Sequence, residues 1–315
     1  MNDLNKLITR SREISWQKFG KKITFYHPGM FRYNGKWGKY PAISITGKHC
    51  ELQCDHCKAK ILESMIFATT PEELIEKCIR LEKLGNTGCL ISGGSQRDGT
   101  IPWHNFISAI KTVKETTNLF ISIHSGIIDF RTAKKLKNAG VDQALIDVIG
   151  DEETFKKIYH LDSGITKMEE SLDALRSADL SIIPHIVVGL DYGKIKGEYH
   201  AIDLIKRYDP EVLVIVSLMS LSGTPMKDIL PPDPQEIAKI IATARIEMTD
   251  VPISLGCARE RANSKIDVLA VDCGVNRIAI PSDEAIKKAQ EYGLDIIWKK
   301  TCCSVPIKTE EVKNE

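Results

Sequence analysis

From residue 42 onward, two patterns of apolar and polar positions alternate along the chain. Short runs rich in Val, Ile and Leu are typical of buried strands, and between them lie longer stretches with the apolar spacing of amphipathic helices. Strands that alternate with helices in this way favour a parallel sheet built from repeated βα units. The strand candidates are residues 42–46, 88–92, 119–123, 144–148, 181–189, 212–219, 252–256 and 277–281.

The stretches between these runs carry helix boundary signals. Residues 71–85 close on Gly85, a candidate C-terminal cap, and an apolar helical face over residues 233–248 begins behind Asp233, a candidate N-cap. Eight strands, each followed by a helix, predict an α/β fold of the closed (β/α)8 TIM-barrel type, which needs ~250 residues. An open (β/α)6 partial barrel with a C-terminal extension is the alternative.

The first forty residues differ from this repeating pattern. Leu4, Leu7, Ile8 and Ile14 fall at helical spacings, and an aromatic stretch broken by Gly and Pro follows them. We therefore expect three parts, which are an N-terminal arm (1–40), a barrel (41–294) and a C-terminal tail (295–315). A length of 315 residues is compatible with a single α/β barrel domain.

Composition and charge narrow the class of protein. Lys and Arg number 43 against 42 Asp and Glu, which argues against nucleic acid or an anionic membrane as the main partner. The sequence holds neither a signal-peptide core nor eighteen consecutive apolar residues. Nine cysteines are an odd number, so a secreted disulfide framework is disfavoured, and we expect a cytoplasmic protein whose reduced thiols bind metal or do chemistry.

Three of the cysteines form a compact motif directly after the first predicted strand. Cys50, Cys54 and Cys57 lie in "KHCELQCDHCKAK", and a loop that follows a barrel strand belongs to the catalytic face. A structural zinc site closes with four ligands, and the nearest further donors are His49 and His56. His56 shares a short turn with Cys57, which disfavours joint ligation. Three cysteinates without a fourth partner suit a 4Fe-4S cluster that has one open iron, and zinc remains the alternative.

The C-x3-C-x2-C spacing in the first βα loop resembles the radical S-adenosylmethionine (SAM) superfamily. The resemblance implies that the open iron binds the amino and carboxylate groups of SAM, and that an electron from the cluster cleaves SAM to a 5′-deoxyadenosyl radical. His56 stands where the family usually has an aromatic residue packed on adenine. Gly93 and Gly94 resemble the Gly-Gly-Glu stretch whose backbone receives the SAM amino group, although Ser95 replaces the glutamate.

Polar residues interrupt three of the apolar strand candidates. His124 and Ser125 end the third strand, Asp147 lies in the fourth and His185 lies in the fifth. A buried polar group without a partner costs about 1–3 kcal/mol, so these residues are unexpected in a purely structural strand. We predict that they contribute to the shell around SAM and substrate.

A second group of cysteines is predicted from topology. Cys257 ends the seventh strand on the catalytic face, and Cys302 and Cys303 lie in the tail. If the tail folds back over the barrel mouth, these three thiols could hold an auxiliary iron-sulfur cluster facing SAM. Its fourth ligand could be Ser304, Arg259 or Cys273. The remaining thiols, Cys78 and Cys89, are expected to be buried core residues.

Taken together, "SITGKHCELQCDHC", "LISGG", "PHIVVGL", "SLGCARER" and "CCS" resemble biotin-synthase-like radical SAM proteins, and among these the subunits of the two-component archaeal-type lipoyl synthase. The resemblance places Val187 and Gly189 beside adenine. It implies sulfur insertion from an auxiliary 4Fe-4S cluster into an octanoyl chain on a lysine of a lipoyl carrier protein or peptide. It also implies a sister radical SAM subunit and a ferredoxin- or flavodoxin-type reductant.

Two alternatives remain at this point. One is a different biotin-synthase-like reaction in cofactor biosynthesis, in which the second cluster transfers electrons or binds substrate. The other is a non-catalytic iron-sulfur or zinc protein with an electron-transfer or structural role. The sequence has no basic run interleaved with aromatic residues that would indicate nucleic-acid binding.

Overall fold

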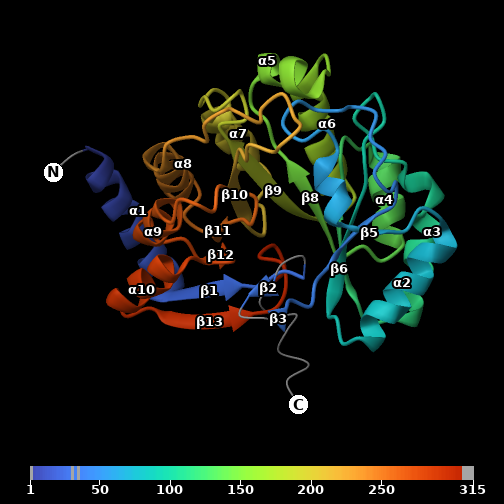
Figure 1. Cartoon of the computed structure of the whole chain (residues 1–315), viewed down its shortest axis with the longest axis horizontal. Helices are drawn as coiled ribbons and strands as arrows, with labels where there is room; N and C mark the ends of the chain where they lie inside the picture. The colour runs from blue at the N-terminus through green and yellow to red at the C-terminus, as the bar shows by residue number, and fades with distance from the viewer. Residues whose placement is uncertain (1–2, 30–31, 34–35, 307–315) are drawn as a thin grey trace.

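The computed structural model describes residues 3–29, 32–33 and 36–306 (Figure 1). Parts of the predicted arm (1–2, 30–31 and 34–35) and of the predicted tail (307–315) lie outside the described residues. One parallel sheet of eleven strands dominates the fold, in the order β13-β1-β12-β11-β10-β9-β8-β7-β6-β4-β5. Its strands are β1 (Lys22–Tyr26), β4 (Ala42–Ser44), β5 (Ile66–Phe67), β6 (Gly88–Ser92), β7 (Phe120–His124), β8 (Gln143–Asp147), β9 (Ser181–Val188), β10 (Leu213–Ser217), β11 (Ile253–Leu255), β12 (Arg277–Ala279) and β13 (Asp295–Lys299). A separate antiparallel pair joins β2 (Arg32–Tyr33) and β3 (Lys36–Trp37).

Helices cover the outer face of the curled sheet (Figure 1). They are α1 (Asp3–Phe19), α2 (Pro71–Lys83), α3 (Ile107–Thr116), α4 (Phe130–Asn138), α5 (Glu152–Thr154), α6 (Gly164–Ser177), α7 (Glu198–Ile205), α8 (Pro234–Glu247), α9 (Lys265–Asp272) and α10 (Asp283–Glu291). Short 3-10 helices span Lys60–Ser64 and Trp103–Asn105, and a π-helical turn spans Phe155–Tyr159. The helices pack on one another in chain order around the sheet, for example α2 on α3, α8 on α9 and α9 on α10.

All eight predicted strands are present and lie in chain order from β4 to β12, which confirms the α/β class. The sheet is a curled half-barrel rather than a closed ring. The edge of β12 pairs with β1, and β13 adds beyond β1, so β12 is not available to pair with β4. The open alternative therefore describes the sheet better, although it carries more strands than the six-unit form.

Local sequence explains why the outer helices start where they do. The side chain of Thr70 accepts a hydrogen bond from Glu73 N, and Pro71 opens α2. Asp233 caps α8 in the same way by accepting from Gln235 N, as predicted. Gly85 follows α2 with φ +75°, a left-handed conformation that suits glycine after a helix. These caps satisfy backbone groups that a helix end leaves unpaired.

The N-terminal segment is partly integrated into the sheet. The predicted helix is present as α1, which packs on α8 and α9 and buries Ile8. The chain then enters the sheet as β1, between β12 and β13. The division into an N-terminal arm (1–40) and a barrel stays a prediction. The main domain packs against the apolar face of α1 and supplies hydrogen-bond partners for the backbone of β1.

The parallel strands give the half-barrel two distinct ends. The loops that follow the strands lie at one end, here called the mouth, and the first residues of the strands lie at the other, here called the floor. Because the apolar strands are covered by helices outside and by side chains inside, both faces are buried. Functional side chains can therefore be placed by the strand end from which they project.

Candidate active site

The loop after β4 brings Cys50, Cys54 and Cys57 together at the mouth. It turns tightly at the second cysteine, where the Cys54 carbonyl accepts a hydrogen bond from Cys57 N at 3.1 Å. Cys54 is buried, and the other two cysteines are half-buried. The hydrogen-bonded thiol of Cys57, burial and the nearby Cys50 all raise the pKa of Cys54. The three predicted thiols thus share one small patch, packed against Leu52 and Leu161.

Cys57 has the environment of a metal-binding thiolate. The hydrogen bond with Cys54 lowers the pKa of Cys57, and the adjacent His56 lowers it further, which together outweigh burial. The thiolate is the form of cysteine that binds metal. The His56 ring packs against Tyr159 with ring centroids 5.4 Å apart. The buried Tyr159 hydroxyl, close to Cys54 and Cys57, has no hydrogen-bond partner among the described residues, which suits a bound polar group at this position.

Gly94 allows the turn after β6 to press against the cysteine loop. A Cβ atom at this position would lie 2.6 Å from the Cα of Cys50 and would overlap the His49 carbonyl oxygen. The Gly94 N–H donates to the Thr46 hydroxyl at 2.7 Å, and Ser95 O accepts from the loop backbone at Glu51 N. The glycine is therefore required here by close packing. Contact of Gly93, Gly94 and Ser95 with the SAM amino group stays a prediction.

His124, Asp147 and His185 project from three neighbouring strands and form an ionic cluster. His124 Nε2 lies 3.5 Å from Asp147 Oδ1, and Asp147 is in register with His185. Burial would raise the pKa of Asp147, but His124, His185 and His56 outweigh it and lower the pKa to about 2. Burial lowers the pKa of His185 to about 4 despite Asp147, whereas Asp147 raises the pKa of His124 against the effect of burial.

Ser125 plays a structural part beside this cluster. Its hydroxyl donates to Leu145 O at 3.3 Å and to Gly126 O at 3.0 Å, and the residue is fully buried. Of the polar residues that end the third predicted strand, His124 is the one that belongs to the ionic cluster. An ionic cluster at the mouth, near the cysteine loop, is consistent with the predicted shell for SAM and substrate.

A hydrogen-bonded clamp ties the cysteine loop to the loop after β9. Asp55 lies between two of the motif residues and accepts a hydrogen bond from the Tyr192 hydroxyl at 2.7 Å. His160 Nε2 and Lys58 Nζ lie 3.2 and 3.4 Å from the same carboxylate. Burial would raise the pKa of Asp55, but these three neighbours lower it. The cysteine loop is therefore held in place from two other loops of the mouth.

The predicted adenine segment ends in a constrained turn. Gly189 has φ +77°, and a Cβ atom there would overlap the side chain of Pro232. Its N–H donates to Glu198 Oε1 at 2.7 Å, and Lys196 N donates to the other oxygen of that buried carboxylate. Val187 faces the interior of the half-barrel. The turn is thus rigid, and the packing of Val187 and Gly189 beside adenine stays a prediction.

The second group of predicted thiols also converges. Cys302 and Cys303 are hydrogen-bonded to each other. Cys257 is near enough to raise the pKa of Cys303, and after burial Cys302 raises the pKa of Cys257. The Cys303 thiol and the Ser304 hydroxyl lower the pKa of Cys302 against the effect of burial. Three thiols from two distant segments therefore meet inside the half-barrel. Binding of an auxiliary cluster by these thiols stays a prediction.

The tail folds back into the half-barrel. Residues 301–306, here called the tail segment, follow β13 and turn into the interior. Arg277, the first residue of β12, donates to Cys303 O at 2.8 Å, and Gln143, the first residue of β8, donates to Ser304 Oγ at 3.1 Å. The open side of the sheet leaves the interior free for this segment, which fills it with buried side chains.

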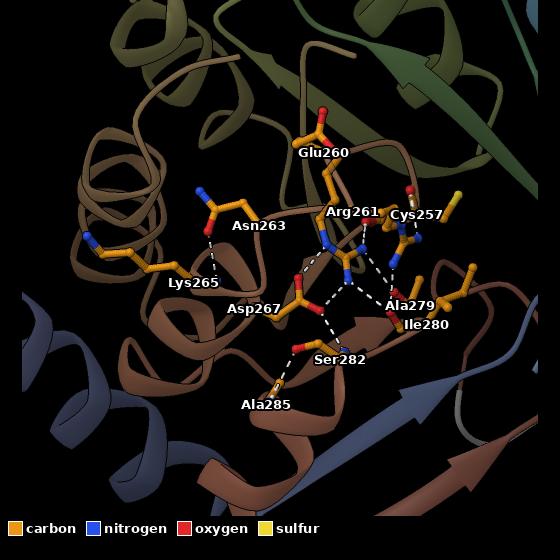
Figure 2. Close-up of polar contacts among 12 residues, drawn as sticks. Cys257, Glu260, Arg261, Asn263, Lys265, Asp267, Ala279, Ile280, Ser282 and Ala285 are labelled. Carbon is orange, nitrogen blue, oxygen red and sulfur yellow. Dashed lines mark hydrogen bonds and ion pairs between the residues drawn. The ribbon is translucent and has the colours of Figure 1, made fainter. Parts of the chain in front are cut away.

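The three candidates for a fourth auxiliary ligand lie in different surroundings. Arg259 has all its donors engaged, in a two-pronged contact with Asp267 and in bonds to the carbonyls of Gly256, Ala279 and Ile280. Figure 2 shows the carboxylate of Asp267 aimed into this network, with Cys257 at its edge. Cys273 lies in the outer helical layer, where its thiol donates to Ala238 O, so the structure does not bring it to the other thiols. Ser304 lies next to Cys302.

Two further thiols lie outside both cysteine groups. Cys78 and Cys89 are fully buried and contact each other between α2 and β6. In the described part of the chain, no group of three His, Cys, Asp or Glu side chains converges as it would around a single metal ion. The donor set of three clustered cysteines, with a lowered pKa at Cys57, fits a thiolate-bound iron-sulfur cluster.

Among the described helices, none is long and apolar enough to cross a membrane.

Several residues of these sites have no distinguishing feature in the sequence. Thr46, Tyr192 and Glu198 act through contacts with other loops, and each looks like an ordinary loop or helix-start residue in the sequence. Gln143 and Arg277 did carry a signal, since each is a polar residue at the start of an apolar strand. The contrast arises because strand polarity is visible locally, whereas a contact between loops depends on the fold.

Comparison with protein families gives two adjoining matches. The model described as "Radical SAM superfamily" matches residues 44–196, and the model described as "Biotin and Thiamin Synthesis associated domain" matches residues 206–296. The chain is 25% identical over 245 residues to a biotin synthase of Prochlorococcus marinus subsp. pastoris, covering 75% of this chain and 72% of that protein. It is 22% identical to the mitochondrial biotin synthase of Arabidopsis thaliana, covering 84% and 71%.

Solved structures show the same fold. A methylornithine synthase superposes with a TM-score of 0.66 and 17% identity, covering 93% of this chain and 89% of that chain. The FeFe-hydrogenase maturase HydG from Carboxydothermus hydrogenoformans superposes with a TM-score of 0.67 and 14% identity, covering 94% and 72%. At these identities the similarity concerns the curled α/β architecture, which places the cysteine loop of this chain at the mouth.

Proposed function

Because this chain belongs to the radical SAM superfamily in a biotin-synthase-like form, we propose that it inserts sulfur into an unactivated carbon of an octanoyl chain. The acceptor in this proposal is the octanoyl group on a lysine of a lipoyl carrier protein, and a sister radical SAM subunit completes the pair. The observation that carries the proposal is the convergence of Cys257, Cys302 and Cys303 inside the half-barrel. A ferredoxin- or flavodoxin-type protein would supply electrons.

The residues at the mouth have defined parts in this scheme. Cys50, Cys54 and Cys57 would hold the first cluster, and Gly94 allows the adjoining turn to pack on their loop. When bound with SAM, that cluster supplies a 5′-deoxyadenosyl radical, which removes a hydrogen atom that no side chain is basic enough to remove as a proton. Asp147, ionised at neutral pH, is available to accept hydrogen bonds from hydroxyl groups of a bound ligand.

The interior thiols provide a place for the sulfur source. Cys302 has a lowered pKa and is therefore predisposed to be a thiolate ligand, while Cys257 faces it from the end of β11. These residues would hold an auxiliary iron-sulfur cluster, and that cluster would supply the sulfide for transfer. Arg259 of the buried Arg259–Asp267 pair donates to Gly256 O, directly before Cys257, and to Ile280 O, directly after β12, so it ties the Cys257 loop to the neighbouring loop.

A second candidate is sulfur insertion into a free small molecule. The match to a biotin and thiamin synthesis associated domain and the biotin synthases among the relatives favour it. The two candidates share both cysteine groups and the radical step, and they differ in the acceptor. An acceptor on a carrier protein requires that the mouth admit a side chain attached to another protein.

The experiment is a mass-spectrometric assay with an octanoyl-lysine peptide as acceptor. Anaerobically reconstituted protein is incubated with SAM and reductant, alone and with a candidate sister subunit, and the peptide is examined for added sulfur. Cys302→Ser should retain SAM cleavage and lose sulfur transfer, because it removes a ligand of the interior site only. Cys78→Ser is the matched control, because that buried thiol lies outside both sites and should leave sulfur transfer intact.

The outcomes separate the candidates. Sulfur added to the peptide by the wild type and by Cys78→Ser, but not by Cys302→Ser, supports the proposal. Cleavage of SAM without sulfur on the peptide, together with loss of sulfide from the protein when a small acceptor is offered, supports the second candidate. No loss of sulfide with either acceptor contradicts sulfur insertion.

A further inference from the structure

The interior of the half-barrel holds a buried arginine whose positive charge has no carboxylate partner. Arg277 is 4% exposed. Its Nη1 donates to Cys303 O at 2.8 Å and to Val305 O at 3.2 Å. Among the residues that the structure describes, Arg277 makes no ion pair and its Nε has no hydrogen-bond partner. The other arginine of this interior, Arg259, is by contrast matched by Asp267.

A second buried polar side chain holds the same segment from the opposite strand. Gln143 is fully buried, and its Nε2 donates to Ser304 Oγ at 3.1 Å and to Ser122 Oγ at 2.8 Å. Its Oε1 has no partner among the described residues. The tail segment itself turns on a bond from Val305 N to Cys302 O at 3.1 Å. Four hydrogen bonds thus fix the turn that carries both tail cysteines.

An uncompensated buried cation is costly unless an anion is nearby. The tail segment that Arg277 holds carries Cys302 and Cys303, two of the predicted cluster ligands, and cysteines are thiolates when they bind iron. The Arg277 bonds go to the backbone of the tail segment, so the charge is placed at the turn that carries two of the three sulfurs. This arrangement matches a site built for an anionic, thiolate-bound group.

We propose that Arg277 is the positioning residue of the auxiliary site, where it holds the tail segment in the interior and offsets the negative charge of the bound cluster. This inference rests on the proposed function, because it assigns the interior thiols to an auxiliary cluster. Gln143 assists by holding Ser304. Without Arg277, Cys257 would remain in the loop after β11, while Cys302 and Cys303 would leave the interior more readily. The three ligands would then no longer be held together.

The test uses three variants with two readouts. Arg277→Met removes both the charge and the donors, Arg277→Lys keeps the charge, and Gln143→Met removes only the second anchor. Arg245→Met is the matched control. Arg245 is buried too, at 1% exposed, and donates to backbone carbonyls, among them Val251 O at 2.7 Å, but it lies in the outer helical layer. The first readout is the alkylation rate of Cys302 and Cys303 in metal-free, reduced protein, followed by peptide mass spectrometry.

In that readout, Arg277→Met should raise the alkylation rate of the tail cysteines by roughly tenfold or more, because local opening becomes easier. Gln143→Met should raise it less, and Arg245→Met should leave it unchanged. The second readout is the reduction potential of the auxiliary cluster. This potential should fall in Arg277→Met, since removing a nearby positive charge disfavours the addition of an electron to the cluster. Arg277→Lys should restore most of that potential.

Equal alkylation rates in Arg277→Met and wild type would overturn the inference, and so would an unchanged potential. If Arg277→Met does not fold, Gln143→Met decides the test, because an alkylation rate equal to that of the wild type would show that these polar residues do not hold the tail segment. The proposed function fails separately. Wild-type protein that binds a single cluster and never transfers sulfur refutes the auxiliary site, whereas the alkylation of metal-free protein still reports how the tail segment is held.

Discussion

Removing the carboxylate from the buried Arg259–Asp267 pair should be the most destabilising single polar change near the interior site. Arg259 Nε and Nη2 lie 2.7 and 2.9 Å from the two oxygens of Asp267, and the side chains are 0% and 6% exposed. Asp267 also accepts from Ser282 N at 2.8 Å. Asp267→Asn keeps the shape but removes the charge, and so leaves a buried guanidinium without its counter-ion.

The expected cost is about 3–5 kcal/mol, the range for breaking a buried, hydrogen-bonded ion pair by changing one partner. The remaining acceptors of Arg259 are backbone carbonyls, which cannot neutralise its charge. The measurement is urea unfolding of metal-free protein under anaerobic, reducing conditions, so that cluster loss does not distort the transition. Asp162→Asn is the control, because its pair with Lys156 is exposed and should change stability by less than about 0.5 kcal/mol.

A loss below about 1 kcal/mol in Asp267→Asn would refute this reasoning, since it would mean that the guanidinium finds water or another partner at little cost. A loss that also appears in Asp162→Asn would have the same meaning, because it would show that burial does not set the magnitude. The expected result also predicts faster alkylation of Cys257, since Gly256 O and Ile280 O are held by the same guanidinium.

Three further changes have definite expected results. Gly94→Ala should lower iron bound at the cysteine loop, measured as iron per chain, because its Cβ would overlap the His49 carbonyl; retention of full iron would contradict the packing argument. The lowered pKa of His185, about 4 against 6.5 unfolded, means that the unfolded chain binds the proton first, so stability falls as pH drops from about 6.5 to about 4. His185→Gln should remove about 2 kcal/mol of that loss at pH 5 in urea titrations, and an unchanged pH slope would be inconsistent with a buried neutral imidazole. Tyr192→Phe loses the bond to Asp55 and should lower stability by about 1–2 kcal/mol, and a neutral effect would show that the clamp is not formed in solution.

The fold was predictable from sequence where local signals decide it. Each of the eight apolar runs became a strand, because a buried parallel strand needs continuous apolar residues on both faces. The open shape was not predictable in the same way. It follows from the pairing of β1 with β12 and β13, which joins the two ends of the chain and leaves no periodic signal in either segment.

The candidate site also has parts that local sequence predicts and parts that depend on the fold. The two cysteine groups could be predicted because thiol spacing and strand ends are visible in the sequence. In the structure, the cysteines within each group lie close to one another. The residues that hold the tail segment were not predicted, because its contacts with Arg277 and Gln143 join distant parts of the chain and depend on the fold. Cys273 was a plausible ligand by residue type, but it lies in the helical layer, since it ends α9 on the outer face of the sheet.

The most direct test of the central claim is the formation of 5′-deoxyadenosine. Anaerobically reconstituted and reduced protein is incubated with SAM, and the product is measured by liquid chromatography and mass spectrometry. We expect 5′-deoxyadenosine from the wild type and from Cys302→Ser, and none from Cys54→Ser. No product from wild-type protein whose cluster is shown spectroscopically to be intact, or equal product from Cys54→Ser, would contradict the assignment of Cys50, Cys54 and Cys57 to radical generation.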